Sequence, residues 1–231
     1  MKEDFKDFIE ASGLLEYDPD TISKIYRKNP KRLFKRLWQT LIPIFAYIVS
    51  VGFDKITGKL KNESQARYRA KQLTALLVEL GPAFVKAGQA LSTRPDIIPV
   101  VLLEELSQLQ DQLPGFSGDK AMELIEKDLD KNINDIFLKI DKDPISAASL
   151  GQVHKAILKD GEVVAVKVQR PGLREQITLD LYIVRNIAIW LKNNIGLIRS
   201  DLVALIDELG KRVFEEMDYI NEAENAEKFR N

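Results

Sequence analysis

The sequence predicts an α+β fold in which helices come first, a small antiparallel sheet follows, and further helices complete the chain. Residues 63–130 place apolar side chains at helical spacing, whereas residues 131–171 change to β-branched strand character. Asp160-Gly161 lies between two short apolar runs, and this dipeptide is typical of a tight hairpin turn. Residues 172–231 return to amphipathic helical patterns, so we expect helices to predominate.

The composition excludes several classes of function. A net charge of −1 over 231 residues argues against a chain-wide nucleic-acid binder, and the absence of cysteine excludes disulfides, zinc–thiolate sites and thiol catalysis. His154 is the only histidine, which argues against a catalytic triad or a multi-histidine metal site. We interpret His154 as a solvated strand residue. The first residues are mixed in charge and do not resemble a secretory signal.

Residues 1–62 are predicted to form an N-terminal extension that contains a strongly basic segment. Between residues 24 and 36, seven side chains are basic and none is acidic: Lys24, Arg27, Lys28, Lys31, Arg32, Lys35 and Arg36. Such a cluster is typical of a segment that lies on an anionic membrane surface. It is also compatible with a solvated basic face on a helix that packs against the main domain. We do not expect this segment to bind nucleic acid, because no nucleic-acid-binding fold motif accompanies it.

An apolar run at residues 41–53 follows the basic segment. The aromatic residues of this region fit either a protein core or a lipid anchor: Trp38, Phe45 and Tyr47. Pro43 and Gly52 are expected to interrupt a long helix, because proline lacks an amide donor and glycine is a weak helix former. The sequence therefore has no clear membrane-spanning helix, and a segment that lies on the membrane is favoured over one that crosses it.

The next region begins with a helical pattern over residues 63–80 that ends at Gly81-Pro82. Proline is favoured in the first turn of a helix, so we expect a new helix to begin at Pro82. Lys86 and Gln89 lie three residues apart in that helix and therefore share one face.

The same region carries the apolar positions expected to form a helical core. Phe84 and Leu91 lie away from the Lys86 face and are predicted to be buried. Four leucines at helical spacing form a predicted packed stripe: Leu102, Leu106, Leu109 and Leu113. Pro114-Gly115 ends that helix, and Ser117 is expected to cap another over residues 119–129.

The strand segment VVAVKVQ, residues 163–169, is almost entirely apolar and is interrupted by Lys167. A lysine in such a strand is costly to bury unless it meets an anion. In protein kinases a V-A-I-K strand has this pattern, and its lysine reaches the ATP phosphates and pairs with a glutamate of helix αC. The alternative is an edge strand whose lysine faces water.

The last part of the chain predicts two amphipathic helices, over residues 179–196 and 202–229, separated at Gly196.

Four short stretches, read together, resemble the UbiB/ADCK (AarF-domain) atypical protein-kinase-like family. They lie in the order of that family's motifs, at residues 85–99, 146–156, 164–172 and 214–229. The resemblance covers about residues 65–231, and the basic extension is similar to that of cyanobacterial and plastid members.

The resemblance implies a nucleotide site. Lys167 resembles the nucleotide-binding lysine, and Glu222 resembles its ion-pair partner on helix αC. The family's alanine-rich nucleotide loop corresponds to Ser146, Ala147, Ala148, Ser149 and Gly151. Ser146 departs from the alanine that many members have at this position, and we expect this change to be tolerated.

The resemblance also implies a regulatory contact. Lys86 and Gln89 match the signature helix that folds over the active site, and Glu216 and Asp218 match the E-x-D motif that holds that lysine. Two residues at i and i+2 do not share a face of a regular helix. The chain near residues 216–218 must therefore depart from a regular helix, or one of the two carboxylates must point elsewhere.

The domains expected are the extension at residues 1–62, a helical family-specific region at 63–130, and a kinase-like N-lobe at 131–231. No H-R-D-like or D-F-G element occurs, so we expect the C-lobe to be absent and the chain alone to be inactive. ATP is the implied cofactor, with magnesium only if a C-lobe is supplied, and the sequence itself predicts no metal site.

The family resemblance implies an atypical kinase or ATPase in isoprenoid-quinone or prenyl-lipid metabolism. The expected partners are a nucleotide, membrane lipid and proteins of prenyl-quinone biosynthesis, on the cytoplasmic or stromal side of a membrane. The alternative function is a non-catalytic, membrane-peripheral regulatory module that binds lipid or partner proteins.

Overall fold

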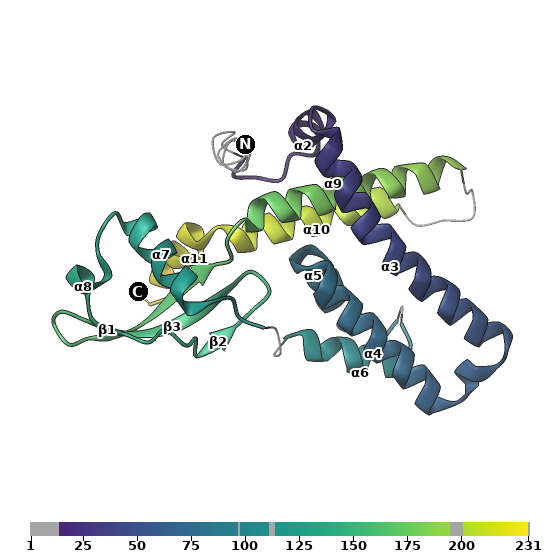
Figure 1. The fold of residues 1–231 in the computed structure, drawn as a ribbon, viewed down its shortest axis with the longest axis horizontal. Helices are drawn as coiled ribbons and strands as arrows, with labels where there is room; N and C mark the ends of the chain where they lie inside the picture. The colour runs from purple at the N-terminus through teal and green to yellow at the C-terminus, as the bar shows by residue number, and fades with distance from the viewer. Residues whose placement is uncertain (1–13, 97, 111–113, 195–200, 231) are drawn as a thin grey trace.

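The computed structural model describes residues 14–96, 98–110, 114–194 and 201–230. The helices are α2 (Pro19–Arg27), α3 (Pro30–Ile56), η1 (Lys59–Lys61), α4 (Glu63–Leu80), α5 (Pro82–Ser92), α6 (Val100–Ser107), η2 (Gln108–Gln110), α7 (Gly118–Leu129), α8 (Ile133–Ile136), α9 (Leu173–Asn194), α10 (Leu202–Met217) and α11 (Tyr219–Arg230). The strands are β1 (Phe137–Ile140), β2 (Ser146–Ala147), β3 (Gly151–Leu158) and β4 (Val163–Gln169). Figure 1 shows the sheet at one end of the molecule, with the long helices α9 and α10 running from it toward a group of helices at the other end. The predicted α+β class, with a small antiparallel sheet, is confirmed.

The sheet is built around β3. Strand β4 pairs antiparallel with β3 over its full length, and β1 and β2 pair with the other side of β3. The hairpin predicted at Asp160-Gly161 is present, and Gly161 adopts a φ of +92°, which glycine tolerates without strain. In this register Lys167 lies opposite Val153.

Helix α7 covers one face of the sheet. Ala121 and Ile125 of α7 form a buried cluster with Phe137, Ala156 and Val168 of the strands. Ser117 occupies the predicted cap position of α7, although its side chain makes no capping hydrogen bond. This packing holds β4, which carries Lys167, on a rigid support.

The interpretation of His154 as a solvated residue is wrong. Its side chain is fully buried in β3, and Nδ1–H donates to the carbonyl oxygen of Asp141 at 2.9 Å. Its Nε2 accepts a hydrogen bond from the Gln152 side chain at 3.1 Å. Gln152 also bonds the backbone of Phe116, so this side chain joins the sheet to the segment before α7. A buried imidazole is accommodated here because both ring nitrogens have partners.

The helical region confirms part of the predicted core. Phe84, Leu106 and Leu109 are buried, whereas Leu91 is 36% exposed, so its predicted burial is wrong. Leu113 lies outside the described residues.

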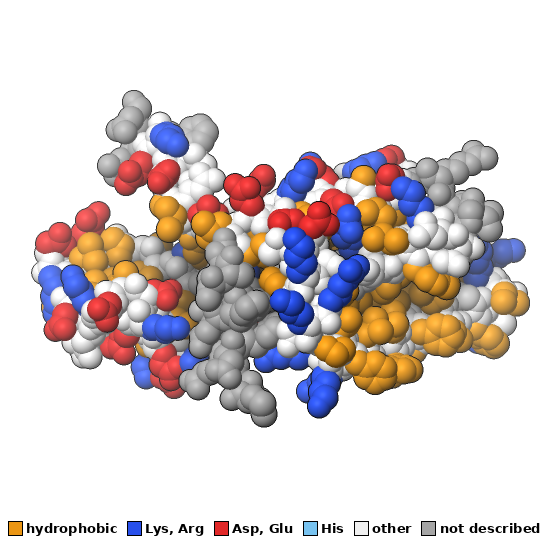
Figure 2. Space-filling view, turned by 90° about the horizontal axis from the view of Figure 1, so that it is seen from above, with side chains coloured by type: hydrophobic (Ala, Val, Ile, Leu, Met, Phe, Trp, Pro, Cys, Tyr) orange, Lys and Arg blue, Asp and Glu red, His pale blue; other side chains and the backbone are white. Residues whose placement is uncertain are grey.

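Helix α3 is continuous over 27 residues, so the interruption predicted at Pro43 and Gly52 is wrong. By length and composition, α3 is the one helix in the described ranges that could cross a membrane. One side of it exposes a continuous row of large apolar side chains: Phe34, Trp38, Leu41, Ile42, Phe45, Ile48, Val49, Phe53 and Ile56. Figure 2 shows apolar side chains gathered on the part of the molecule where α3 lies.

Ion pairs hold α3 on both sides of Pro43. Before the proline, Arg36 donates to Asp180 of α9 at 2.6 and 2.8 Å. After the proline, Asp54 accepts from Arg69 of α4 at 2.6 Å. Because tertiary contacts fix both halves of the helix, the hydrogen bond that Pro43 removes does not end it.

The helix predicted over residues 202–229 is in fact two helices. It breaks at Asp218, whose backbone leaves the helical region at φ −87° and ψ 83°. The Asp218 carboxylate accepts from the backbone N–H of Asn221 at 3.0 Å and caps α11. Gly196, the predicted separator of the preceding helices, lies outside the described residues.

Candidate functional site

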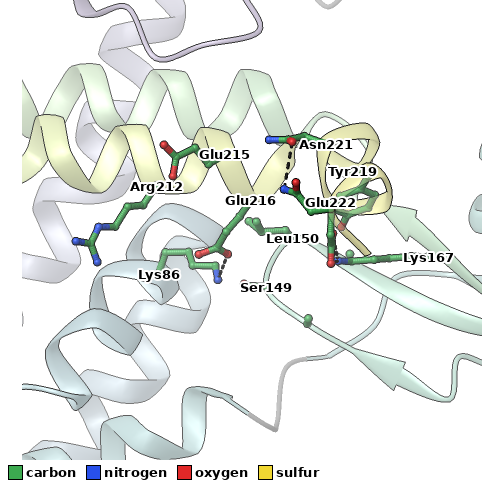
Figure 3. A pocket seen from close by; sticks show the side chains of 13 residues that line it. Lys86, Ser149, Leu150, Lys167, Arg212, Glu215, Glu216, Tyr219, Asn221 and Glu222 are labelled. Atoms are coloured by element: carbon green, nitrogen blue, oxygen red, sulfur yellow. Dashed lines mark hydrogen bonds and ion pairs between the residues drawn. The ribbon is translucent and has the colours of Figure 1, made fainter. Parts of the chain in front are cut away.

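A cavity of about 680 Å³ lies where α5, the loop before β3, strand β4 and the junction of α10 and α11 meet. Each of the four motif stretches contributes side chains to its wall, including Lys86, Ser149, Lys167 and Glu216. Figure 3 shows that two lysines approach this space from different elements and that each meets a glutamate.

The first ion pair joins β4 to α11. The Lys167 ammonium lies 2.7 and 2.5 Å from Oε1 and Oε2 of Glu222. The side chains are 42% and 57% exposed, so this lysine has a carboxylate partner and remains accessible from the cavity. The Lys167 ammonium also lies 4.3 Å from the ring centroid of Tyr219, within the range of a cation–π contact.

The loop between β2 and β3 forms a tight turn beside Lys167. The Ala148 N–H donates to the Gly151 carbonyl at 2.8 Å, and the Arg170 N–H donates to the Leu150 carbonyl at 2.9 Å. The Arg170 guanidinium donates to the Ala148 carbonyl at 3.2 and 2.9 Å and also bonds the Pro114 carbonyl at 2.6 Å. Burial lowers the pKa of Arg170, but the arginine remains a cation near neutral pH. The loop is therefore held from its outer side.

Gly151 stands where no other residue fits without displacement. A Cβ at this position would lie 2.5 Å from the Val168 carbonyl oxygen and 2.6 Å from the Tyr219 hydroxyl. Ala148, Ser149 and Gly151 line the cavity. Ser146 and Ala147 instead pair with β3 and are not part of the wall.

The second ion pair joins α5 to α10. Lys86 pairs with Glu216, and both side chains line the cavity. Gln89, predicted to share the face of Lys86, donates to the Leu109 carbonyl at 2.8 Å and fastens α5 to η2. Asp218 caps α11 and lies outside the cavity wall. The chain departs from a regular helix at Asp218, as the first alternative for the E-x-D motif has it, yet only Glu216 meets the lysine and Asp218 points elsewhere, as the second has it.

Sequence reasoning missed Tyr219 and Leu150, which both line the cavity. Tyr219 lies three residues before Glu222, and this spacing on a helix was the available signal that the two share a face. Burial raises the pKa of Tyr219 to about 12, so its hydroxyl is neutral at physiological pH.

Two lysines line the cavity, each paired with a glutamate, and an anionic ligand could replace either glutamate as the partner of its lysine. Within the described ranges, no group of three or more His, Asp or Glu side chains is placed to hold a metal ion.

Part of the basic segment serves the fold. Arg32 pairs with Glu175 and Arg36 pairs with Asp180, so two of its seven cations contact α9. Lys31 and Lys35 are exposed.

The family model described as ABC1 atypical kinase-like domain matches residues 108–231. An uncharacterized protein of Synechocystis sp. is 50% identical over 93% of this chain and 31% of its own length. The chloroplastic protein ACTIVITY OF BC1 COMPLEX KINASE 3 of Arabidopsis thaliana is 42% identical over 93% of this chain and 30% of its own length. An uncharacterized, chloroplastic aarF domain-containing protein kinase of the same plant is 47% identical over 96% of this chain and 32% of its own length.

The chain spans about a third of the length of these relatives. The resemblance identified from the four motif stretches is confirmed, and the chain belongs to the ABC1 atypical kinase-like family.

Proposed function

We propose that the cavity binds an adenine nucleotide and that this chain is the nucleotide-binding portion of an atypical kinase or ATPase. The observation that carries the proposal is the Lys167–Glu222 pair, 2.5–2.7 Å apart, beside a tight loop that ends at Gly151. A lysine held by a glutamate next to a small-residue loop is the arrangement with which kinases hold ATP phosphates. The cavity volume lies within the usual range of ligand pockets, roughly 300–1,000 Å³.

The loop fits a phosphate group. Small side chains at Ala148 and Ser149 let phosphate oxygens approach the backbone, as in glycine-rich loops. Bound ATP would supply the phosphoryl group, while Lys167 would orient its phosphates and Glu222 would keep the ammonium in place. We propose that ligands for magnesium come from parts of the protein other than the residues described.

The proposal is tested by titrating a non-hydrolysable ATP analogue into the chain and into a Lys167→Ala variant. We expect affinity to fall about tenfold, which corresponds to ~1.4 kcal/mol. Lys155→Ala is a matched control, since Lys155 is an exposed lysine of the neighbouring strand β3 and does not line the cavity. Equal affinities for the wild-type and Lys167→Ala chains would exclude the role given to Lys167.

We further propose that the whole protein acts in isoprenoid-quinone or prenyl-lipid metabolism in association with a membrane. The family membership and the chloroplastic relatives support this proposal. The measurement is the prenyl-quinone content of cells in which the gene is deleted, compared with cells complemented by the wild type or by Lys167→Ala. Unchanged quinone content in the deletion strain would contradict it.

A second candidate function is peripheral binding to an anionic membrane through α3. Its exposed apolar row, from Phe34 to Ile56, has exposed cations near both ends, with Lys31 and Lys35 near its start and Lys55 near its end. The only acid between residues 30 and 62 is Asp54, which is buried against Arg69. An apolar face with basic ends and no exposed acid is complementary to lipid headgroups and the acyl chains beneath them.

The inward contacts of α3 favour a helix that lies on the membrane over one that spans it. Thr40 and Asp54 are only 1% and 2% exposed, because both pack against the rest of the chain. Insertion of α3 across a bilayer would expose these two polar side chains to hydrocarbon. Co-sedimentation with vesicles that contain phosphatidylserine tests the proposal. We expect binding that weakens as salt rises and that Phe45→Ser reduces. The matched control is Leu138→Ser, an equally exposed apolar residue on the sheet.

A further inference from the structure

Tyr219 contacts the ammonium group of Lys167 through the face of its ring. The distance from Lys167 Nζ to the ring centroid is 4.3 Å, well inside the ~6 Å limit for an attractive cation–π contact. Tyr219 is the first residue of α11, and Glu222 follows one turn later. Figure 3 shows both side chains reaching from this helix toward Lys167. The lysine is therefore held by a carboxylate and by an aromatic face from the same helix.

The other end of the tyrosine reaches the nucleotide loop. A Cβ on Gly151 would lie only 2.6 Å from the Tyr219 hydroxyl oxygen. The phenol therefore packs directly against Gly151, the residue that ends the loop. Among the described residues, this buried hydroxyl has no hydrogen-bond partner. The hydroxyl therefore fills space against Gly151, while the face of the ring attracts the Lys167 ammonium electrostatically.

We propose that Tyr219 is a positioning residue that holds the Lys167 ammonium at the mouth of the cavity through the face of its ring. The inference rests on the proposed function, because holding the Lys167 ammonium in place matters only if it contacts an anionic phosphate. When a phosphate draws the ammonium away from Glu222, the ring still limits where the ammonium can move. A neutral aromatic face serves this purpose because, unlike a second carboxylate, it does not repel the ligand's charge.

The competing explanation is that Tyr219 only fills space between α11 and the loop. The two explanations differ in what the ring's chemistry does. A space-filling role is met by an aliphatic side chain, whereas a cation–π role requires an aromatic ring and requires Lys167 to be present. The decisive comparison is therefore between Tyr219→Phe, which keeps the ring, and Tyr219→Leu, which removes it.

The experiment measures binding of a non-hydrolysable ATP analogue to the full chain in four variants: Tyr219→Phe, Tyr219→Leu, Lys167→Ala and the double variant Tyr219→Leu/Lys167→Ala. We expect Tyr219→Phe to bind within twofold of wild type. Tyr219→Leu should bind about two- to fivefold more weakly, the size of a partly exposed cation–π contact. In the Lys167→Ala background the leucine substitution should have no further effect.

A second measurement does not depend on a nucleotide. With selectively ¹³C-labelled lysine, the ε-methylene protons of Lys167 should be shifted upfield by the ring current in wild type and in Tyr219→Phe. They should return to the position of the exposed Lys155 signal in Tyr219→Leu. If the leucine variant does not fold, the wild-type and phenylalanine spectra still decide whether the ring lies against the ammonium.

Three results would overturn the inference. They are an unshifted Lys167 signal in wild type, equal weakening by phenylalanine and leucine, and an undiminished effect of leucine when Lys167 is absent. Failure of the wild-type chain to bind any adenine nucleotide would instead overturn the proposed function, and the Lys167 signal would then decide the position of the ring by itself.

Discussion

The cavity and helix α3 place charged and apolar groups in opposite ways. In the cavity the pair Lys167–Glu222 is roughly half exposed, and the apolar support lies beneath the sheet. On α3 the ion pair with Asp180 is buried, with 0% of the aspartate side chain exposed, and the large apolar side chains face outward. The same chemical groups therefore serve different purposes in the two regions.

The difference shows which charges specify the fold and which remain available to a ligand. A buried pair that loses one member leaves an uncompensated charge, so it constrains how helices dock. An exposed pair contributes little to stability and exchanges its partner at low cost. We therefore expect stability to depend on the α3 pairs and ligand binding to depend on the cavity pairs.

The largest expected effect is on stability when Asp180 is replaced by alanine. The substitution leaves the Arg36 side chain, which is only 18% exposed, without its carboxylate, which costs about 3–5 kcal/mol in the free energy of unfolding. Urea unfolding followed by circular dichroism measures it. The control is the double variant Arg36→Met/Asp180→Leu, which should recover most of the loss because no charge remains buried. A loss below about 1 kcal/mol for Asp180→Ala would show that the α3 pair stabilises the fold no more than the exposed pair in the cavity does.

The second largest expected effect is a loss of stability at acidic pH. Hydrogen bonds from Arg69 and Gln65 lower the pKa of Asp54 below its ordinary value of 3.8. Stability from this group is therefore fully present above pH 3.8 and is lost as pH falls through the lower pKa of the folded state. The difference in unfolding free energy between wild type and Asp54→Asn should shrink as pH is lowered below 3.8. A difference that stays constant between neutral pH and strong acid would show that the carboxylate charge does not fasten α3.

A smaller effect is expected when the cavity pair is broken. Lys167→Ala should change the free energy of unfolding by less than about 1 kcal/mol, because both partners are partly exposed. The same substitution should weaken binding of the ATP analogue about tenfold. Chemical unfolding and nucleotide titration on one preparation test both parts. A large loss of stability would show that the Lys167–Glu222 pair stabilises the fold, as the ion pairs of α3 are expected to do.

The smallest effect on stability is expected for Phe45→Ser on the outer side of α3. Phe45 is 68% exposed, so its replacement should change the free energy of unfolding by no more than about 0.5 kcal/mol. Thermal unfolding in the absence of lipid measures this. A marked destabilisation would mean that the apolar row of α3 is covered in solution, for example by a second copy of the chain, which analytical ultracentrifugation would detect.

The sequence predicted the hairpin and the strand that carries Lys167 because both depend on local signals. Asp160-Gly161 determines a turn by its own conformational preference, and the strand around Lys167 is apolar enough to make the lysine conspicuous. Glu222 was reachable only through the family resemblance, since a glutamate in an acidic helix is ordinarily solvated.

Other features depend on tertiary contacts that no local pattern shows. The burial of His154 requires Gln152 and a carbonyl oxygen 13 residues earlier in the chain. The continuity of α3 through Pro43 depends on α4 and α9. The break at Asp218 was predicted only as one of two alternatives, because a single carboxylate cap competes with a continuous amphipathic pattern on both sides.

The break at Asp218 separates the rotational phases of α10 and α11. In one continuous helix, inserting a residue would turn every later side chain by about 100°, so Glu216 and Glu222 could not vary independently. Because the chain leaves the helical region at Asp218, one helical repeat does not fix both directions: Glu216 meets Lys86 of α5, and Glu222 meets Lys167 of β4. The break therefore lets two glutamates six positions apart in the chain meet cations on two different elements, a helix and a strand.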